Sequence, residues 1–333
     1  MMMLPGQVGK MRFDEFDARE LPPGFKQAVY MDVVHLATGP LRLPILVARG
    51  VELGPRVSVL GGVHGDEYEG PYAVREIFES LKPSEMSGTF LGVPHANPPA
   101  FLAGTRVSPV DNGNLARVFP GDPQGTVTER IAHFLGKRII GDSDFLIDLH
   151  SSGSSTAIPP MIGYYSHDSD VGIASKAAAE IFGMPVLWGH PGISPGRTIT
   201  EATYRGIPWL YTESLGGGSL HLEHARMYIR GVRNVMKHLG VLLGEIEVCE
   251  TTHHLFGDGD LGKGARTDAG GYLLARVELL AKVKCGDVLG EVIGLGGELL
   301  DEIRAPKDGV VISMRSTPSV SAGDVVFSLT EEA

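Results

Sequence analysis

Short apolar segments that end in glycine or in a polar residue alternate with helical patterns over most of this 333-residue chain. Residues 56–60 (RVSVL) are apolar and β-branched and lead into Gly61-Gly62, as expected for a buried strand that ends in a loop. Apolar residues recur at helical spacing over residues 70–81, and the apolar run at residues 145–150 predicts another strand. Strands that alternate with helices predict an α/β fold with a mixed, largely parallel sheet flanked by helices.

The same patterns predict the other elements of this part of the chain. Further strands are expected within residues 28–48, with a turn at 38–40, and at 88–93 and 209–213; further helices at 128–139, 175–182 and 221–243; and a long loop rich in Pro, Gly and Asn at 94–125. Open α/β sheets bind their ligands at the carboxyl ends of the strands, so residues that follow strands are the first candidates for a site.

The carboxyl-terminal part of the chain has a different pattern, in which short β-rich segments are separated by Gly and Gly-Asp. We therefore predict two domains, a catalytic domain over residues 1–249 with an N-terminal β segment and an accessory β-domain over residues 250–333. A weak internal repeat, residues 271–289 and 309–326, predicts a small barrel or sandwich. The pattern resembles biotinyl- or lipoyl-type carriers, but the connection at residues 294–298 has no attachment lysine, which argues against a carrier.

Composition excludes several classes of partner. A net charge of −11 makes nucleic acid and an anionic membrane surface poor partners. The two cysteines, Cys249 and Cys285, match no metal-binding spacing and cannot form a disulfide framework. Residues 1–6 lack the apolar run of a signal peptide, and no segment reaches the ~18 apolar residues of a membrane span. We expect a soluble, cytoplasmic protein. The sequence does not decide whether it forms a homo-oligomer.

The clearest chemical signal lies in residues 61–70, which read GGVHGDEYEG. His64 and Glu67 are three residues apart just after a predicted strand, and a pair at this spacing in a turn can direct both side chains at one point. His150 ends another predicted strand, so it would reach the same edge of the sheet. Either feature alone is more often an ordinary polar residue, but two His and one Glu with an open position form a catalytic zinc pattern. We therefore predict one Zn²⁺ per chain, held by these three residues.

If the zinc ion activates water for hydrolysis, the reaction also needs a proton acceptor and positive charge. Glu213 ends the predicted strand at residues 209–213, where a carboxylate could take the proton of a water molecule and pass it to the leaving nitrogen. Arg106 and Arg117 lie in one Gly-rich loop; one of them could bind a substrate carboxylate and the other could stabilise the tetrahedral intermediate. The alternatives are a surface acid and two loop arginines in structural ion pairs.

Together these segments resemble the succinylglutamate desuccinylase/aspartoacylase family, a branch of the zinc carboxypeptidase-like hydrolases. The matching segments, in the family's order, are residues 61–67 (GGVHGDE), 96–101 (ANPPAF), 104–106 (GTR), 117–121 (RVFPG), 148–150 (DLH) and 212–213 (TE). The resemblance implies a zinc carboxypeptidase-like fold with a carboxyl-terminal β-domain. It also implies hydrolysis of the amide bond of a small N-acyl amino acid.

The resemblance further implies a role for each candidate residue. Glu213 would be the general base, Arg106 would polarise the carbonyl, and Arg117, with Asn114, would bind the substrate. One position departs from the family, which has Asn before this arginine, whereas the chain has Ala116. A hydrogen bond to a charged group is worth ~1.5–3 kcal/mol, and alanine cannot make it. Acylated diamino acids, other N-acyl amino acids and less acidic amides therefore all stay open as substrates.

Three functions are compatible with these residues. We predict a zinc-dependent deacylase acting on a small N-acyl amino acid or a related amide. The first alternative is a zinc carboxypeptidase acting on short peptides, which the loss of the Asn at Ala116 disfavours because such enzymes bind a free carboxylate. The second is a binding protein that retains the scaffold without catalysis, which the presence of all three ligands and Glu213 disfavours.

Overall fold

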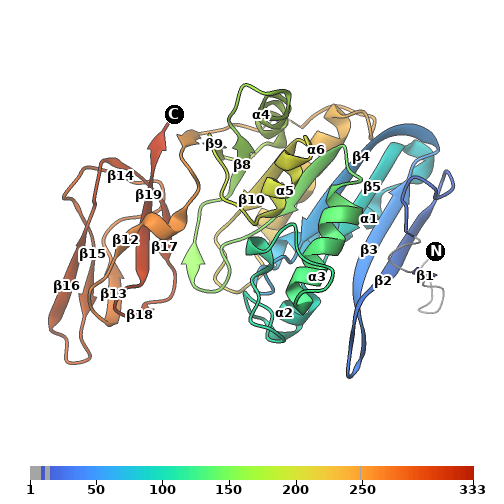
Figure 1. The fold of residues 1–333 in the computed structure, drawn as a ribbon. Coiled ribbons are helices and arrows are strands. Elements are labelled where there is room, and N and C mark those ends of the chain that lie inside the picture. The colour runs from blue at the N-terminus through green and yellow to red at the C-terminus, as the bar shows by residue number, and fades with distance from the viewer. Residues whose placement is uncertain (1–8, 12–15, 248) are drawn as a thin grey trace.

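The computed structural model describes residues 9–11, 16–247 and 249–333, and its ribbon is drawn in Figure 1. Residues 1–6, in which we expected no signal peptide, lie outside the described residues. The strands are β1 (Gly9–Met11), β2 (Lys26–Leu36), β3 (Gly39–Arg49), β4 (Glu52–Gly61), β5 (Ser87–Val93), β6 (Phe145–Leu149), β7 (Thr156–Ala157), β8 (Met161–Tyr165), β9 (Val186–His190), β10 (Trp209–Glu213), β11 (His253–Phe256), β12 (Ala265–Arg266), β13 (Gly271–Ala275), β14 (Lys282–Val283), β15 (Val288–Ile293), β16 (Leu299–Arg304), β17 (Gly309–Arg315), β18 (Ser319–Val320) and β19 (Val325–Glu332). The α-helices are α1 (Glu69–Ser80), α2 (Pro98–Ala103), α3 (Val127–Phe134), α4 (Asp170–Phe182), α5 (Thr198–Tyr204) and α6 (Leu222–His238), and α3 continues into a π-helical turn (Leu135–Ile140).

The central strands of the large sheet are parallel. β4 pairs in parallel with β5 and with β6, and β6 pairs in parallel with β10. On one side β2 and β3 form an antiparallel hairpin that joins β5; on the other side β8 is antiparallel to β10 and parallel to β9. The order along the sheet is β1-β2-β3-β5-β4-β6-β10-β8-β9-β11-β19-β17-β14. The predicted α/β fold with a mixed, largely parallel sheet is confirmed.

Alternation of side chains along the central strands gives the sheet two apolar faces. Val57 and Val59 of β4 pack with the buried residues of α1, α4 and α6 on one face. Leu60 of the same strand packs on the other face, with buried residues of α3, the π-helical turn and α5. The sheet is therefore covered by helices on both faces, as its near-continuous apolar central strands predict.

Two predicted elements differ from the structure. The helix predicted at residues 221–243 ends at His238, and Gly240 follows with a positive φ of 76°, a conformation that glycine adopts without strain. The long loop predicted at residues 94–125 contains the helix α2, which starts with two prolines after the capping residue Asn97. A helix of six residues is too short to show an apolar repeat in the sequence.

The carboxyl-terminal strands continue the large sheet. β11 pairs in parallel with β9 and antiparallel with β19, so the sheet passes from the larger part of the chain into β19, β17 and β14. A second sheet, in the order β16-β15-β13-β18, packs against these strands around an apolar core that includes Leu289, Val311 and Phe327. We call residues 257–333 together the β-domain; it lies at the left of Figure 1.

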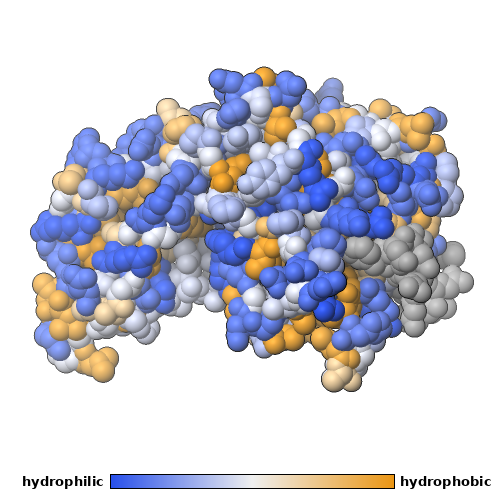
Figure 2. Space-filling model, viewed as in Figure 1, coloured by the Kyte–Doolittle hydropathy of each residue, from blue (hydrophilic) through white to orange (hydrophobic). Residues whose placement is uncertain are grey.

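The surface drawn in Figure 2 mixes hydrophilic and hydrophobic residues and is indented between the β-domain and the rest of the molecule. None of the helices within the described ranges combines the length and the hydrophobicity that a membrane span needs.

Candidate functional site

The carboxyl ends of three neighbouring parallel strands meet at one edge of the sheet. β4, β6 and β10 are adjacent and run in the same direction. His64 lies shortly after β4, His150 directly follows β6, and Glu213 is the last residue of β10. Glu67 lies in the turn between β4 and α1. Strand ends that are sequentially distant thus bring four polar side chains to one place.

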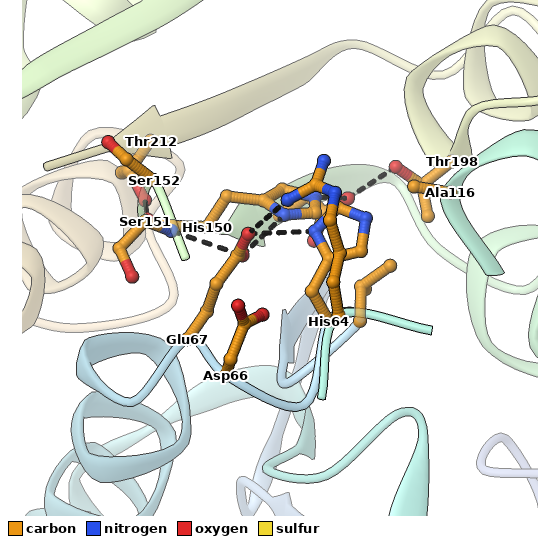
Figure 3. Close-up of polar contacts among 12 residues, drawn as sticks. His64, Asp66, Glu67, Ala116, His150, Ser151, Ser152, Thr198 and Thr212 are labelled. Carbon is orange, nitrogen blue, oxygen red and sulfur yellow. Dashed lines mark hydrogen bonds and ion pairs between the residues drawn. The ribbon is translucent and has the colours of Figure 1, made fainter. Parts of the chain in front are cut away.

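His64, Glu67 and His150 form a buried cluster, in which one ligand atom from each residue lies within 4.8 Å of the others (Figure 3). His64 Nδ1 is 2.8 Å from Glu67 Oε1, and His150 Nδ1 is 2.9 Å from Glu67 Oε2. The backbone N–H of Ser151 also donates to Oε2, at 3.2 Å. Imidazole nitrogen and carboxylate oxygen are the donor atoms that bind zinc in catalytic sites.

The outer nitrogens of the two imidazole rings also face oxygen acceptors. His64 Nε2 is 3.2 Å from Asn114 Oδ1, and His150 Nε2 is 3.0 Å from Asp148 Oδ2. A neutral imidazole has only one N–H, so it cannot donate to an oxygen on each side. When both Nε2 atoms donate outward, the two Nδ1 lone pairs and the carboxylate of Glu67 face one another. These groups repel one another, and a cation placed among them would be bound by all three. The residues present therefore fit a divalent metal ion such as zinc.

The two oxygen acceptors behind the rings are themselves held in place. Thr198, the first residue of α5, donates its hydroxyl proton to Asp148 Oδ2. Asn114, which we predicted to contact substrate, has its Oδ1 turned to His64, and this oxygen also accepts the N–H of Ala116 at 3.1 Å. Both contacts fix the orientation of a histidine ring.

The cluster shifts the pKa values of its own members. Burial alone would raise the pKa of Glu67, but His64 and His150 hold it well below its usual range. Burial opposes a positive charge on His150, yet the carboxylates of Asp148 and Glu67 raise its pKa well above the ordinary value. Burial lowers the pKa of His64. The carboxylate of Glu67 therefore favours positive charge between the two rings, whereas burial opposes charge on the rings themselves.

The turn that carries His64 and Glu67 packs tightly against α2. A Cβ atom on Gly65 would lie 2.0 Å from the carbonyl carbon of Ala100, so only glycine fits there. The N–H of Gly65 donates to the carbonyl oxygen of Thr105 at 3.0 Å, which ties the turn to the chain beyond α2. The α2 segment therefore sets the position of the turn.

Glu213 lies beside this cluster. Its Oε2 atom is buried and has no hydrogen-bond partner among the described residues. Burial, together with the negative charge of Glu67, raises the pKa of Glu213 to about 8. A carboxyl group whose pKa lies near neutral pH is suited to accepting a proton and returning it.

The site opens into a cavity of about 380 Å³ that both parts of the chain line. The larger part contributes His64, His150 and Glu213, and the β-domain contributes Asp260 and Arg315 among others. This volume is within the range of small-molecule sites. The β-domain is therefore a wall of the candidate site.

Four arginines line the cavity: Arg315 from the β-domain, and Arg106, Arg117 and Arg197 from the larger part of the chain. Arg106 Nη1 donates to Glu67 Oε1 at 3.2 Å, and Arg117 Nη1 donates to the carbonyl oxygen of Ala116 at 2.8 Å. Burial and the positive charges of Arg197 and Arg106 lower the pKa of Arg117. The Nε atom of Arg197 is buried and has no partner within the described part of the chain. These three arginines could bind an anionic group in the cavity, whose acidic lining residues are Asp66, Asp148, Glu213 and Asp260.

Arg197 and Tyr211 are cavity residues that the sequence analysis missed. Arg197 lies in a Pro- and Gly-rich segment between two elements that were not predicted, β9 and α5. Tyr211 precedes Glu213 by two residues on β10, and side chains two apart on a strand share a face. Strand alternation was therefore the signal that could have identified Tyr211.

Comparison with known proteins identifies the family. The family model described as the succinylglutamate desuccinylase/aspartoacylase catalytic domain matches residues 53–239. The chain belongs to this family. N-alpha-acetyl-L-2,4-diaminobutyric acid deacetylase from Halomonas elongata is 33% identical over 299 residues, which make up 89% of this chain and 87% of that protein.

Solved structures of family members have the same fold. The product-bound structure of the ectoine utilization protein EutE (DoeB) from Ruegeria pomeroyi has a TM-score of 0.86 and 31% identity, over 94% of this chain and 96% of that one. The succinylglutamate desuccinylase/aspartoacylase from Rhodobacter sphaeroides has a TM-score of 0.84 and 30% identity, over 92% and 95%. The predicted family is thus confirmed, and its named members include deacylases of small acylated amino acids.

Proposed function

We propose that this family member is a zinc-dependent deacylase that hydrolyses the amide bond of a small N-acyl amino acid. The observation that carries the proposal is the convergence of His64, Glu67 and His150 beside Glu213 in one cavity of small-molecule size. His64, Glu67 and His150 would hold the zinc ion. Zinc bound there would lower the pKa of a water molecule to about 7 and polarise the scissile carbonyl.

The chain's own residues supply the proton transfer and the charge. Glu213 takes the proton of the attacking water at its carboxylate and returns it to the leaving nitrogen. Arg106, which donates to Glu67 at the edge of the cluster, adds positive charge where the carbonyl oxygen becomes negative. Asp148 and Asn114 orient the two histidine rings from behind.

We assign binding of the substrate's carboxylate to the arginines of the cavity. Arg117 and Arg197 lie close together, and a bound carboxylate would relieve the repulsion that lowers the pKa of Arg117. Ala116 lines the cavity where the family pattern has Asn, so this position offers the carboxylate no side-chain hydrogen bond. The name of the Halomonas elongata relative makes an N-acetylated diamino acid the first substrate to try.

Metal analysis and a substrate panel test this proposal. We expect purified protein to contain about one zinc ion per chain, since three protein ligands form one catalytic site. A chelator should abolish hydrolysis of N-acetyl, N-succinyl or N-formyl amino acids, and added zinc should restore it. His150→Ala should lose the metal and the activity together. The proposal would be refuted if the purified protein contained little metal and if zinc, manganese or cobalt restored no hydrolysis.

Comparison of an N-acetyl amino acid with a dipeptide that carries the same side chain distinguishes a deacylase from a carboxypeptidase. Both reactions use the same zinc chemistry, so metal content alone does not distinguish them. We expect the N-acetyl amino acid to be hydrolysed faster than the dipeptide, because the β-domain walls the cavity. Faster cleavage of the dipeptide would favour the carboxypeptidase.

A further inference from the structure

The loop between β10 and α6, residues 214–221, begins directly after Glu213 and contains three consecutive glycines. Gly216, Gly217 and Gly218 have φ values of 67°, 74° and 65°, a left-handed conformation that glycine adopts without strain. Glu213 is the last residue of β10, and its Oε2 atom has no hydrogen-bond partner among the described residues. The position of this carboxylate therefore depends on how the backbone around it is held.

The start of the loop is tied to the segment that follows His150. The carbonyl oxygen of Ser214 accepts the N–H of Ser152 at 3.1 Å and also the hydroxyl proton of Ser152. The N–H of Gly218 donates to the carbonyl oxygen of Gly153 at 3.2 Å. The backbone just after Glu213 is therefore fixed relative to the backbone just after a candidate metal ligand.

The end of the loop is tied to α1 by Glu69. The N–H of His221 donates to Glu69 Oε1 at 3.0 Å. His221 Nε2 lies 2.8 Å from the carbonyl oxygen of Gly216 and donates to it, because a carbonyl oxygen only accepts. Glu69 is the first residue of α1, two positions after Glu67, and His221 directly precedes α6. The loop is thus held between the segment after His150 and the turn that carries Glu67.

The carboxylate of Glu69 is buried at a cost. The residue is 0% exposed, and its second oxygen, Oε2, has no partner in the part of the chain that the structure describes. Burial of an incompletely hydrogen-bonded carboxylate is unfavourable. Two roles could offset this cost. A negative charge in the first turn stabilises a helix, and the hydrogen bond to His221 holds the loop.

We infer that Glu69 is a positioning residue for catalysis, which acts through His221 and the loop to hold Glu213 in place. Glu69 does not line the cavity, so it reaches the reaction only through other residues. A displacement of about 1 Å of a catalytic group can lower a rate by roughly 10²-fold, so a contact at this distance matters for turnover. This inference rests on the proposed function, in which Glu213 transfers the proton.

Two substitutions separate the hydrogen bond of Glu69 from its charge. Glu69→Leu removes the acceptor for the N–H of His221, whereas Glu69→Gln removes the charge and keeps an acceptor oxygen. With an N-acetyl amino acid as substrate, we expect Glu69→Leu to lower kcat roughly 10-fold to 100-fold without a change in KM or metal content, and Glu69→Gln to behave like wild type. Glu79→Leu, on the exposed last turn of α1, is the matched control and should change none of these quantities.

A double variant tests whether Glu69 acts through Glu213. In Glu213→Gln the proton acceptor is already lost, so adding Glu69→Leu should lower kcat by less than about 3-fold. A full further loss would overturn the inference, as would unchanged kcat in Glu69→Leu. Loss of metal in Glu69→Leu, or an equal loss of kcat in Glu69→Gln, would assign the residue to the metal-site turn or to the helix and would also overturn it. Should Glu69→Leu not fold, His221→Ala, which breaks the contact with Gly216, gives the same test.

Hydrogen exchange provides a measurement that needs no substrate. The amides of Ser152 and Gly218 donate across the contact between the two segments, and neither is hydrogen-bonded to Glu69. We expect both to exchange at least about 10-fold faster in zinc-loaded Glu69→Leu than in wild type, and at the wild-type rate in Glu69→Gln. If wild-type protein hydrolyses no N-acyl amino acid, the proposed function fails, and exchange alone decides. Faster exchange then supports the hold of Glu69 on the loop, and unchanged exchange refutes it.

Discussion

Among single residues, Glu213 is the cavity acid best able to move a proton near neutral pH. Its pKa of about 8 results from burial and from the negative charge of Glu67. Glutamine at this position keeps the size of the side chain but cannot accept a proton. We expect Glu213→Gln to lower kcat by roughly 10²-fold to 10⁴-fold while the protein keeps its metal and its fold. Steady-state kinetics and metal analysis on one preparation measure both effects.

Glu223→Gln is the control for this substitution. Glu223 is an exposed glutamate in the first turn of α6 and does not line the cavity, so its loss should leave kcat unchanged. Full activity in Glu213→Gln would exclude the proton-transfer role. Loss of metal in that variant would instead assign Glu213 to the structure of the metal site.

Residues at strand ends are the part of the site that the sequence reveals. His64, His150 and Glu213 each stand at or just after a short apolar run, and the direction of parallel strands brings them to one edge. Contacts between strands, such as the 2.8 Å contact of the Tyr211 phenol oxygen with His190 Nε2, could not be found this way. They depend on which strands become neighbours, and β9 lies next to β8 only after the whole sheet has formed.

Between elements, the packing of α2 against the turn that carries His64 and Glu67 is tight enough to test. Alanine at Gly65 would place its Cβ 2.0 Å from the carbonyl carbon of Ala100, and backbone on both sides has to move. We expect Gly65→Ala to destabilise the protein by about 1–3 kcal/mol and to weaken metal binding at least about 10-fold. Denaturant unfolding and competition with a zinc-binding dye measure the two effects.

Gly192→Ala provides the matched control, because a Cβ there meets no atom within 4 Å and the backbone does not have a positive φ. It should change neither stability nor metal affinity. Normal metal affinity in Gly65→Ala would mean that α2 does not position the ligands. The sequence contains both ends of this contact, GGVHGDE and ANPPAF, but their packing joins a turn to a helix too short to predict.

Across the whole molecule, strands of the β-domain are part of the same large sheet as β4, β6 and β10. The Nε1–H of Trp188 on β9 donates to Thr330 Oγ1 on β19 at 3.0 Å, beside the pairing of β11 with both strands. The change in sequence pattern near residue 250 predicts that a β-rich segment starts there. It contained no information on where that segment docks, because docking depends on contacts between residues about 140 positions apart, a separation that no local pattern records.

His190 lies at this junction and should make the stability of the molecule sensitive to acid. The folded protein holds the pKa of His190 near 4, below the ordinary value of 6.5, because burial disfavours the charged ring. Between these two pH values the unfolded chain binds a proton that the folded protein does not, so stability falls as the pH falls through this window. A difference of about 2.5 pH units corresponds to about 3 kcal/mol.

Glutamine at position 190 binds no proton between pH 7 and pH 4. We therefore expect the unfolding free energy of metal-free wild-type protein to fall by about 3 kcal/mol more than that of His190→Gln between pH 7 and pH 4. A chelator removes any metal from both proteins. Protonation of His64, Glu67 and His150 then contributes equally to the two unfolding free energies and cancels in the difference. Denaturant unfolding at several pH values in this range gives the comparison. Parallel pH profiles would mean that burial does not lower the pKa of His190 in the folded protein.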